Sequence, residues 1–233
     1  MKKKVVLAVG AHPDDIDFGA SGTIAKWAEE GANCYYLICT DGSRGSTDPK
    51  MTHKKLSRIR KKEQAEAGKV LGLKKIFFLN HTDTQLDSDF TLKKDIAKII
   101  KMIKPSIVVT MDPTFYYSEK FNFINHTDHR SASVATMDAC YPLARDRLTF
   151  PEHEEEGLSP HHVEEIWFIG FDKTNLLVDI TDTFAKKIEA IAMHKSQFDD
   201  MKHVIKRVEE RARYFGIVKS CKYAENFVRV ELF

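Results

Sequence analysis

The chain has 233 residues, of which 42% are hydrophobic and 30% charged, a composition typical of globular proteins that excludes a disordered chain. The formal net charge of +2 is too close to balance to indicate nucleic acid as a partner. No apolar run is long enough for a membrane span, and the one near the start is too short for a signal peptide. We therefore expect a cytoplasmic protein with no membrane span, folded as a single α/β domain over residues 1–233.

The four cysteines form no CxxC pair and do not indicate a disulfide framework. Cys34 and Cys39 lie in one strand-like run and are an odd number of residues apart, so they should face opposite sides of that strand. We expect Cys34, Cys39, Cys140 and Cys221 to be reduced core residues, as is usual in the cytoplasm.

The first predicted element is a buried strand at Val5–Val9, a short valine-rich run. The polar stretch Ala11-His12-Pro13-Asp14-Asp15 follows it, and the small residues Gly19–Gly22 lead into a helix predicted at Thr23–Glu30. A histidine and two aspartates thus lie on a strand-to-helix loop. Ligands bind beyond the carboxyl ends of strands in open parallel sheets, so this loop is a candidate site.

Strands and helices then alternate along the first half of the chain. The pattern predicts a strand at Cys34–Ile38, a helix at Leu56–Leu71 ended by Gly72, a strand at Ile76–Leu79, a helix through Ile96–Ile103 and a strand at Ile107–Thr110. This alternation predicts a Rossmann-like, doubly wound, mainly parallel sheet with helices on both faces. In the strand order 3-2-1-4-5, the first and fourth strands are neighbours and a crevice opens between their ends.

The second half continues the alternation after a long connection. We expect a helix at Ser131–Cys140, an irregular segment at Tyr141–His162, strands at Glu165–Ile169 and Leu176–Ile180, helices at Thr183–His194 and Asp199–Phe215, and a last edge strand at Val228–Phe233.

A second cluster of histidines and a carboxylate, His126-Thr127-Asp128-His129, follows the fourth strand. It should meet the first cluster at the crevice, which makes a metal site the leading hypothesis. His12 and Asp15 could converge on one ion, His129 could supply a third ligand, and a carboxylate outside the metal could accept a proton from water. The spacing does not say which aspartate is ligand and which is base. Each cluster alone is as well explained by a turn, a helix cap or a structural histidine; their joint position favours function.

These two clusters resemble the LmbE-like (PIG-L) family of zinc-dependent N-deacetylases, and the resemblance covers nearly the whole chain. Further similar motifs, in chain order, are Thr40-Asp41-Gly42, Arg60-x-x-Glu63 with Leu71-Gly72, Lys104-Pro105 to Val109, Val178-Asp179-Ile180-Thr181 and His194-Lys195-Ser196-Gln197. Any one of these motifs is weak evidence, but their common order is specific.

The resemblance implies one zinc ion per chain, with the ligands His12, Asp15 and His129. It implies that Asp14 is the general base and that His126 stabilises the oxyanion, with Asp128 orienting His126. Thr127 replaces the proline that is usual in the second motif.

The same resemblance implies a substrate-binding rim formed by Arg60 and by the loop from Asp41 to Arg44. Arg60 matches a substrate-contacting arginine, although a surface arginine pairing with Glu63 or Glu66 explains it almost as well. Arg44 stands where many members carry an acidic residue, and Ile124 where some carry a tyrosine near the scissile amide.

The activity that the resemblance implies is removal of an acetyl group from an N-acetylated amino sugar, an N-acetylglucosamine-type conjugate, by metal-activated water. Two alternatives are hydrolysis of another linear amide or acyl group at the same metal, and a catalytically silent metal- or sugar-binding protein. The aromatic residues Phe115, Tyr116, Tyr117, Phe121 and Phe123 crowd one predicted loop. Such a loop packs over the site or against another subunit, and we expect a homo-oligomer.

Overall fold

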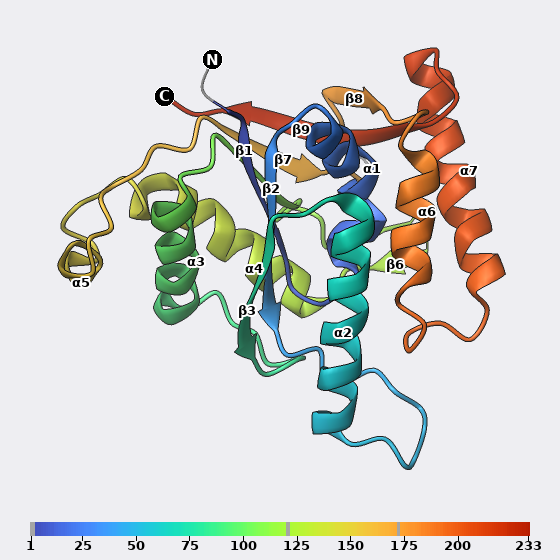
Figure 1. The fold of residues 1–233 in the computed structure, drawn as a ribbon, viewed down its shortest axis with the longest axis horizontal. Coiled ribbons are helices and arrows are strands. Elements are labelled where there is room, and N and C mark those ends of the chain that lie inside the picture. The colour runs from blue at the N-terminus through green and yellow to red at the C-terminus, as the bar shows by residue number, and fades with distance from the viewer. Residues whose placement is uncertain (1–2, 120–121, 172) are drawn as a thin grey trace.

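The fold is organised by a seven-stranded sheet in the order β3-β2-β1-β4-β7-β9-β8 (Figure 1). The structure, a computed structural model, describes residues 3–119, 122–171 and 173–233. The strands are β1 (Val5–Gly10), β2 (Asn33–Thr40), β3 (Lys75–His81), β4 (Ile107–Met111), β7 (Glu165–Ile169), β8 (Leu176–Asp179) and β9 (Ala224–Glu231). The five strands β3, β2, β1, β4 and β7 run parallel to one another, and β9 is antiparallel to both of its neighbours, β7 and β8. The predicted α/β class and the order 3-2-1-4-5 are therefore confirmed.

Helices cover both faces of the sheet, α1, α2, α6 and α7 on one side and α3 and α4 on the other (Figure 1). Their bounds are α1 (Asp15–Glu29), α2 (His53–Leu71), α3 (Phe90–Ile103), α4 (Thr127–Asp138), α6 (Phe184–Ala192) and α7 (Met201–Lys219). The connection after α4 contains the π-helical turn η1 (Ala139–Leu143) and the short α5 (Pro151–Glu155), and a small hairpin, β5 (Tyr117–Ser118) with β6 (Phe123–Ile124), precedes α4. Phe121, part of the predicted aromatic loop, lies outside the described residues.

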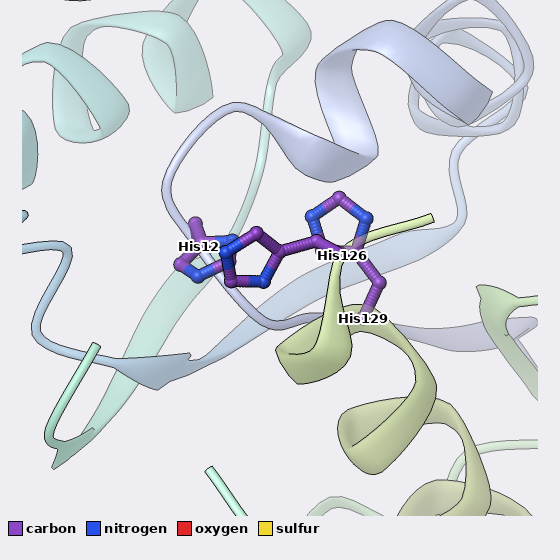
Figure 2. Close-up of side chains that lie close together, drawn as sticks. All are labelled: His12, His126 and His129. Atoms are coloured by element: carbon purple, nitrogen blue, oxygen red, sulfur yellow. The ribbon is translucent and has the colours of Figure 1, made fainter. Parts of the chain in front are cut away.

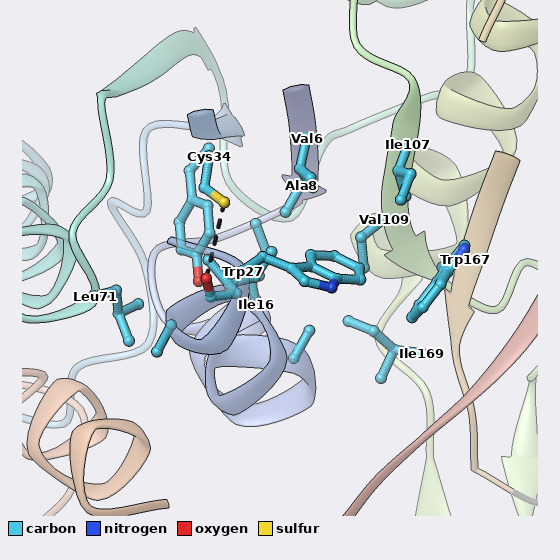
Figure 3. Packing of buried hydrophobic residues seen from close by; sticks show 14 of the residues in the cluster. Val6, Ala8, Ile16, Trp27, Cys34, Leu71, Ile107, Val109, Trp167 and Ile169 are labelled. Atoms are coloured by element: carbon cyan, nitrogen blue, oxygen red, sulfur yellow. Dashed lines mark hydrogen bonds between the residues drawn. The ribbon is translucent and has the colours of Figure 1, made fainter. Parts of the chain in front are cut away.

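The core has two halves, one on each face of the sheet. On one face, strand residues pack against α1, and the rings of Trp27 and Trp167 meet edge to face with centroids 4.8 Å apart (Figure 3). Cys34 lies in this half and Cys39 in the other, as their odd spacing predicts. The cysteines are free; Cys221, however, is only partly buried in a turn and is not a core residue.

Helix α1 begins at Asp15, not at the predicted Thr23. The expectation that the small residues Gly19–Gly22 only lead into the helix is wrong, because they lie within it, and Gly19 and Gly22 allow close packing. A Cβ atom on Gly19 would lie 2.5 Å from the side chain of Ile169, and one on Gly22 would lie 2.7 Å from Ile180. The helix therefore starts directly at the candidate site.

Strand β9 is an interior strand, so the predicted edge position of Val228–Phe233 is wrong. The strand begins at Ala224, and its buried polar residues Glu225 and Asn226 interrupt the apolar pattern. Glu225 is stabilised there by the backbone amides of Gly22 and Thr23, at 3.0 and 2.8 Å. Strand β8 forms that edge of the sheet instead.

Among the described residues, no helix is both long enough and apolar enough to cross a lipid bilayer.

Candidate active site

The two histidine clusters meet beyond the carboxyl ends of β1 and β4, which are neighbouring strands. The ring centroids of His12 and His126 are 4.8 Å apart, and those of His12 and His129 are 5.2 Å apart. Figure 2 shows the three rings gathered between the loop after β1 and the first turn of α4. Helix α4 begins at Thr127, earlier than predicted, so Asp128 and His129 lie in its first turn.

Asp15 lies between His12 and His129. One of its carboxylate oxygens is 3.6 Å from Nδ1 of His12, and the other is 3.0 Å from Nε2 of His129. Ligand atoms about 2.1 Å from a tetrahedral ion lie about 3.4 Å from one another, so each separation taken singly is near that of two ligands of one ion, with a different carboxylate oxygen of Asp15 involved in each. The backbone amide of His12 also donates to Asp15 at 2.8 Å, which fixes the carboxylate in the turn.

Among the described residues, two groups of three side chains bring their potential ligand atoms within 4.8 Å of one another, and Asp15 belongs to neither of them. One is His12 with His126 and His129, and the other is His12 with Asp83 and Asp128. Asp83, which is not among the site residues predicted from the sequence, is buried and lies 3.2 Å from Nε2 of His12. A signal was present, because Asp83 follows the end of β3 just as His12 follows the end of β1.

The site contains more buried negative than positive charge. The pKa of His12 is raised to about 12: burial lowers it, but the nearby carboxylates of Asp15, Asp128 and Asp83 outweigh burial. Burial raises the pKa of Asp83, but the hydrogen bond from His12 outweighs burial and lowers it to about 2. The positive charge of a protonated His12 thus offsets the negative charge of the surrounding carboxylates, and a bound divalent cation could do the same. The nitrogen and oxygen donors of these side chains are suitable ligands for such an ion.

Asp14 has an unusual backbone conformation, with φ 102° and ψ −31°. A residue other than glycine in a sparsely populated backbone region costs about 1–3 kcal/mol, and such strain is concentrated at functional sites. Asp14 precedes α1, yet its carboxylate makes no capping hydrogen bond to that helix. Burial raises the pKa of Asp14 to about 6, against the opposing charge of Arg60. The carboxylate is therefore available to exchange a proton near neutral pH.

Arg60 is buried, with 4% of its surface exposed, and extends from α2 toward the loop after β1. Its guanidinium donates to the carbonyl oxygens of Pro13 at 2.8 Å and Gly42 at 3.3 Å. It also lies 3.5 Å from the carboxylate of Asp14 and 3.7 Å from that of Asp83. The alternative of a surface arginine paired with an acidic residue of its own helix is therefore wrong.

His126 is the most accessible of the three histidines, with 39% of its side chain exposed. It caps α4: its Nδ1 accepts a hydrogen bond from the backbone amide of Asp128 at 3.1 Å. The neutral ring therefore carries its proton on Nε2. Burial and the charge of His12 lower the pKa of His126, which favours this neutral form.

Asp128 is fully buried and closer to His12 than to His126. Its carboxylate lies 3.1 Å from Nε2 of His12 and 4.0 Å from Nδ1 of His126. The same carboxylate accepts from the backbone amides of Thr84 at 2.7 Å and Leu86 at 3.4 Å. Asp128 thus connects α4 to the segment that carries Asp83.

The loop from Asp41 to Arg44 borders the site at the end of β2. The Asp41 carboxylate accepts from the backbone amides of Ser43 at 3.0 Å and Asp83 at 3.2 Å. The backbone amide of Arg44 donates to Asp83 at 2.9 Å, and its guanidinium donates to Thr84 at 2.6 Å. These contacts attach the predicted rim to the segment after β3.

A buried polar network that was not predicted from the sequence lies next to the loop that carries Asp14. Its centre is Asp17, whose carboxylate interacts with Tyr36, Gln64 and His194. A second contact, in which Ser196 donates to Glu63 at 2.7 Å, attaches the segment after α6 to α2. Two of the motifs noted in the sequence therefore meet here.

Comparison with known proteins is consistent with this geometry. The sequence profile of the PIG-L family, described as GlcNAc-PI de-N-acetylase, matches residues 7–140. A diacetylchitobiose deacetylase from Thermococcus kodakarensis is 33% identical over 95% of this chain and 81% of that protein. A protein named "Probable N-acetyl-alpha-D-glucosaminyl L-malate deacetylase 2" from Bacillus anthracis is 26% identical, over 94% of this chain and 91% of its own length. The structure of an N,N'-diacetylchitobiose deacetylase from Pyrococcus horikoshii superposes with a TM-score of 0.90 at 32% identity, over 99% of this chain and 85% of that one.

Proposed function

The chain belongs to the PIG-L (LmbE-like) family, and on that premise we propose that it is a zinc-dependent hydrolase that deacetylates an N-acetylated amino sugar. Its relatives include deacetylases of diacetylchitobiose and of N-acetylglucosaminyl malate, so N-deacetylation is the activity they support. The substrate is an N-acetylglucosamine-type conjugate, and the products are acetate and a free amine.

The proposed metal ligands are His12, Asp15 and His129. The separations of 3.6 and 3.0 Å between Asp15 and the two histidines support this set. Nδ1 of His129 lies 3.0 Å from the side-chain oxygen of Asn125, which leaves Nε2 free to act as a ligand. When bound, the zinc ion lowers the pKa of a water molecule and polarises the acetyl carbonyl group.

Asp14 is the proposed general base. It accepts a proton from the attacking water, whose oxygen bonds to the acetyl carbonyl carbon. As the carbon–nitrogen bond breaks, Asp14 gives that proton to the departing nitrogen, so the products are the free amine and acetic acid, which ionises to acetate. Its pKa of about 6 suits both steps, because the group is mostly ionised yet readily protonated at neutral pH.

His126 is the proposed hydrogen-bond donor to the carbonyl oxygen as negative charge develops there. Its Nδ1 is engaged by the backbone of α4, so Nε2–H is available for a substrate. Asp128 is proposed to orient His126 through its backbone amide, which donates to Nδ1 of His126, because its carboxylate contacts His12 instead. Arg60, Asp41 and Arg44 are proposed to form the substrate side of the site. Arg60 acts there through Pro13 and Asp14, since its own guanidinium is buried.

The observation that carries this proposal is the position of Asp14. Its backbone is strained, its carboxylate makes no capping hydrogen bond to its own helix, and it is adjacent in sequence to Asp15, which contacts both His12 and His129. A protein that only binds a metal or a sugar needs neither the strain nor a carboxylate of raised pKa at this position.

The test is a screen for amine release, with fluorescamine as the reagent, across neutral and anionic N-acetylglucosamine conjugates. The zinc-loaded protein and the chelator-treated protein are compared, and acetate is measured in parallel. Amine and acetate in equal amounts, abolished by chelator and restored by zinc, are expected. Release only from unrelated amides would favour the wider amidase alternative, and binding without release would favour the silent binding protein.

A further inference from the structure

We propose that Gln64 is a positioning residue, which fixes the strained backbone of Asp14 by joining it to the buried Asp17–His194 pair. The inference deepens the proposed function and rests on it for the kinetic part of the test. Gln64 is 1% exposed, so it acts through Asp14 and does not touch a substrate.

The backbone of Asp14 needs an external constraint, because an L-residue rarely adopts a φ of 102°. Its carbonyl oxygen accepts from the amide of Phe18 at 3.1 Å, which is only the first bond of α1. Its amide, by contrast, donates at 3.0 Å to Oε1 of Gln64, on a different helix. That bond fixes the peptide plane between Pro13 and Asp14 from the side of α2.

The orientation of the Gln64 amide is determined by its two partners. Oε1 accepts from the Asp14 amide, and Nε2 donates to a carboxylate oxygen of Asp17 at 2.9 Å. An ionised carboxylate can only accept hydrogen bonds, and a backbone N–H can only donate them. A flipped amide would place oxygen against oxygen and N–H against N–H, so Gln64 has one stable orientation.

Asp17 is itself immobilised, which makes it a firm anchor for Gln64. It is fully buried, and one of its oxygens accepts from the hydroxyl of Tyr36 at 3.2 Å. The other oxygen, which Gln64 also contacts, lies 2.7 Å from Nε2 of His194. The network thus runs from the segment after α6, through Asp17 and Gln64, to the backbone of Asp14.

Tyr36 provides a matched control for Gln64, because the two residues contact different oxygens of the Asp17 carboxylate. Tyr36→Phe removes one hydrogen bond to Asp17 but leaves the connection to Asp14 intact. Gln64→Met removes that connection with little change of side-chain volume. A purely structural role predicts similar effects for the two variants, whereas a positioning role predicts that only Gln64→Met alters Asp14.

The first measurement is amide hydrogen exchange by NMR on the parent and both variants, and it needs no substrate. Gln64→Met should accelerate exchange of the Asp14 amide at least about tenfold relative to Tyr36→Phe, because the amide loses its buried acceptor. Crystal structures of both variants should show Asp14 leaving the positive-φ region in Gln64→Met alone. If Gln64→Met does not fold, Gln64→Asn replaces it, since its shorter amide stays polar but cannot reach both partners.

The second measurement is steady-state kinetics with N,N'-diacetylchitobiose, together with zinc content. Gln64→Met should lower kcat by up to about 100-fold, as expected for a misplaced reacting group, with KM and bound zinc unchanged. Tyr36→Phe should retain near-parent kcat. Unchanged exchange and conformation of Asp14 in Gln64→Met would overturn the inference whatever the kinetics. If the parent releases no amine from any conjugate, the proposed function fails, and the exchange and structural data still decide the role of Gln64.

Discussion

Replacement of Arg60 by methionine should destabilise the protein and make its activity more sensitive to acid. Arg60 is buried between Asp14 at 3.5 Å and Asp83 at 3.7 Å, and it donates to the carbonyl oxygen of Pro13. Removing one partner of a buried ion pair costs about 3–5 kcal/mol, because the other charge stays buried without compensation. For a chain of this size, that corresponds to a fall in Tm of about 6–20 °C.

The pH dependence has a definite sign. Arg60 opposes the effect of burial on Asp14, whose pKa is about 6, so Arg60→Met should raise that pKa further. A base must be ionised to act, so the acid limb of the kcat/KM profile should move to higher pH. The unfolded carboxyl has a lower pKa than the folded one, so the folded state is favoured as pH falls through the folded value. Arg60→Met should therefore recover part of its lost stability between pH 8 and pH 5.

The assay combines thermal unfolding of chelator-treated protein with a pH–rate profile of the zinc-loaded enzyme. Arg58→Met is the matched control, since Arg58 lies on the same helix, is exposed and has no ion pair among the described residues. If Arg60→Met unfolds at the same temperature as Arg58→Met and shows the parent's acid limb, Arg60 does not stabilise the ionised form of Asp14.

Four further predictions concern the proposed base and oxyanion residues, the metal ion, the His194–Asp17 pair and the oligomeric state. Asp14→Asn and His126→Ala should each retain zinc, measured by elemental analysis, and His126→Ala should lower turnover by about 100- to 1,000-fold; near-parent turnover in Asp14→Asn would exclude it as the base. The protein should contain about one zinc ion per chain, and His129→Ala should lose it; full activity without metal would contradict this. Burial lowers the pKa of His194, but the hydrogen bond to Asp17 outweighs burial, so the net pKa is raised. The His194–Asp17 pair should therefore stabilise the folded state fully below a pH of about 6.5, and less as the pH rises. Denaturant unfolding of chelator-treated protein should show that slope, and His194→Gln should flatten it. Light scattering at micromolar concentration should give a multiple of the 26.7 kDa chain mass, and a monomer would disprove the predicted homo-oligomer.

The sheet was largely predictable because its strands are short apolar runs separated by helical patterns. Val5–Gly10 and Ile107–Met111 are buried along almost their whole length, so each is visible in the sequence as a short continuous apolar run. The start of α1 was not predictable in this way, since Gly19 and Gly22 are common in loops. Their reason for being in a helix is contact with Ile169 and Ile180, which are distant in sequence.

The candidate site was predictable where its residues form compact motifs. His12 and His126 each lie after a strand and within three residues of an aspartate, so each forms a recognisable motif. The parallel topology brings the two motifs together. Asp83 is a single carboxylate with no motif around it, although its place after a strand was informative. Gln64 and Asp17 were not predictable, because their role depends on partners from other helices and on burial that only the fold reveals.

Helix α1 depends on the last quarter of the chain for part of its own hydrogen bonding. The amides of Gly22 and Thr23 donate to Glu225, while Lys187 donates to the carbonyl oxygen of Phe18 at 2.7 Å and pairs with Glu225 at 2.7 Å. The family profile ends at residue 140, well before Lys187 and Glu225. A truncation at that limit would remove the groups that complete the helix behind Asp14 and Asp15. The shortest fragment that could fold with an intact site therefore extends at least through β9.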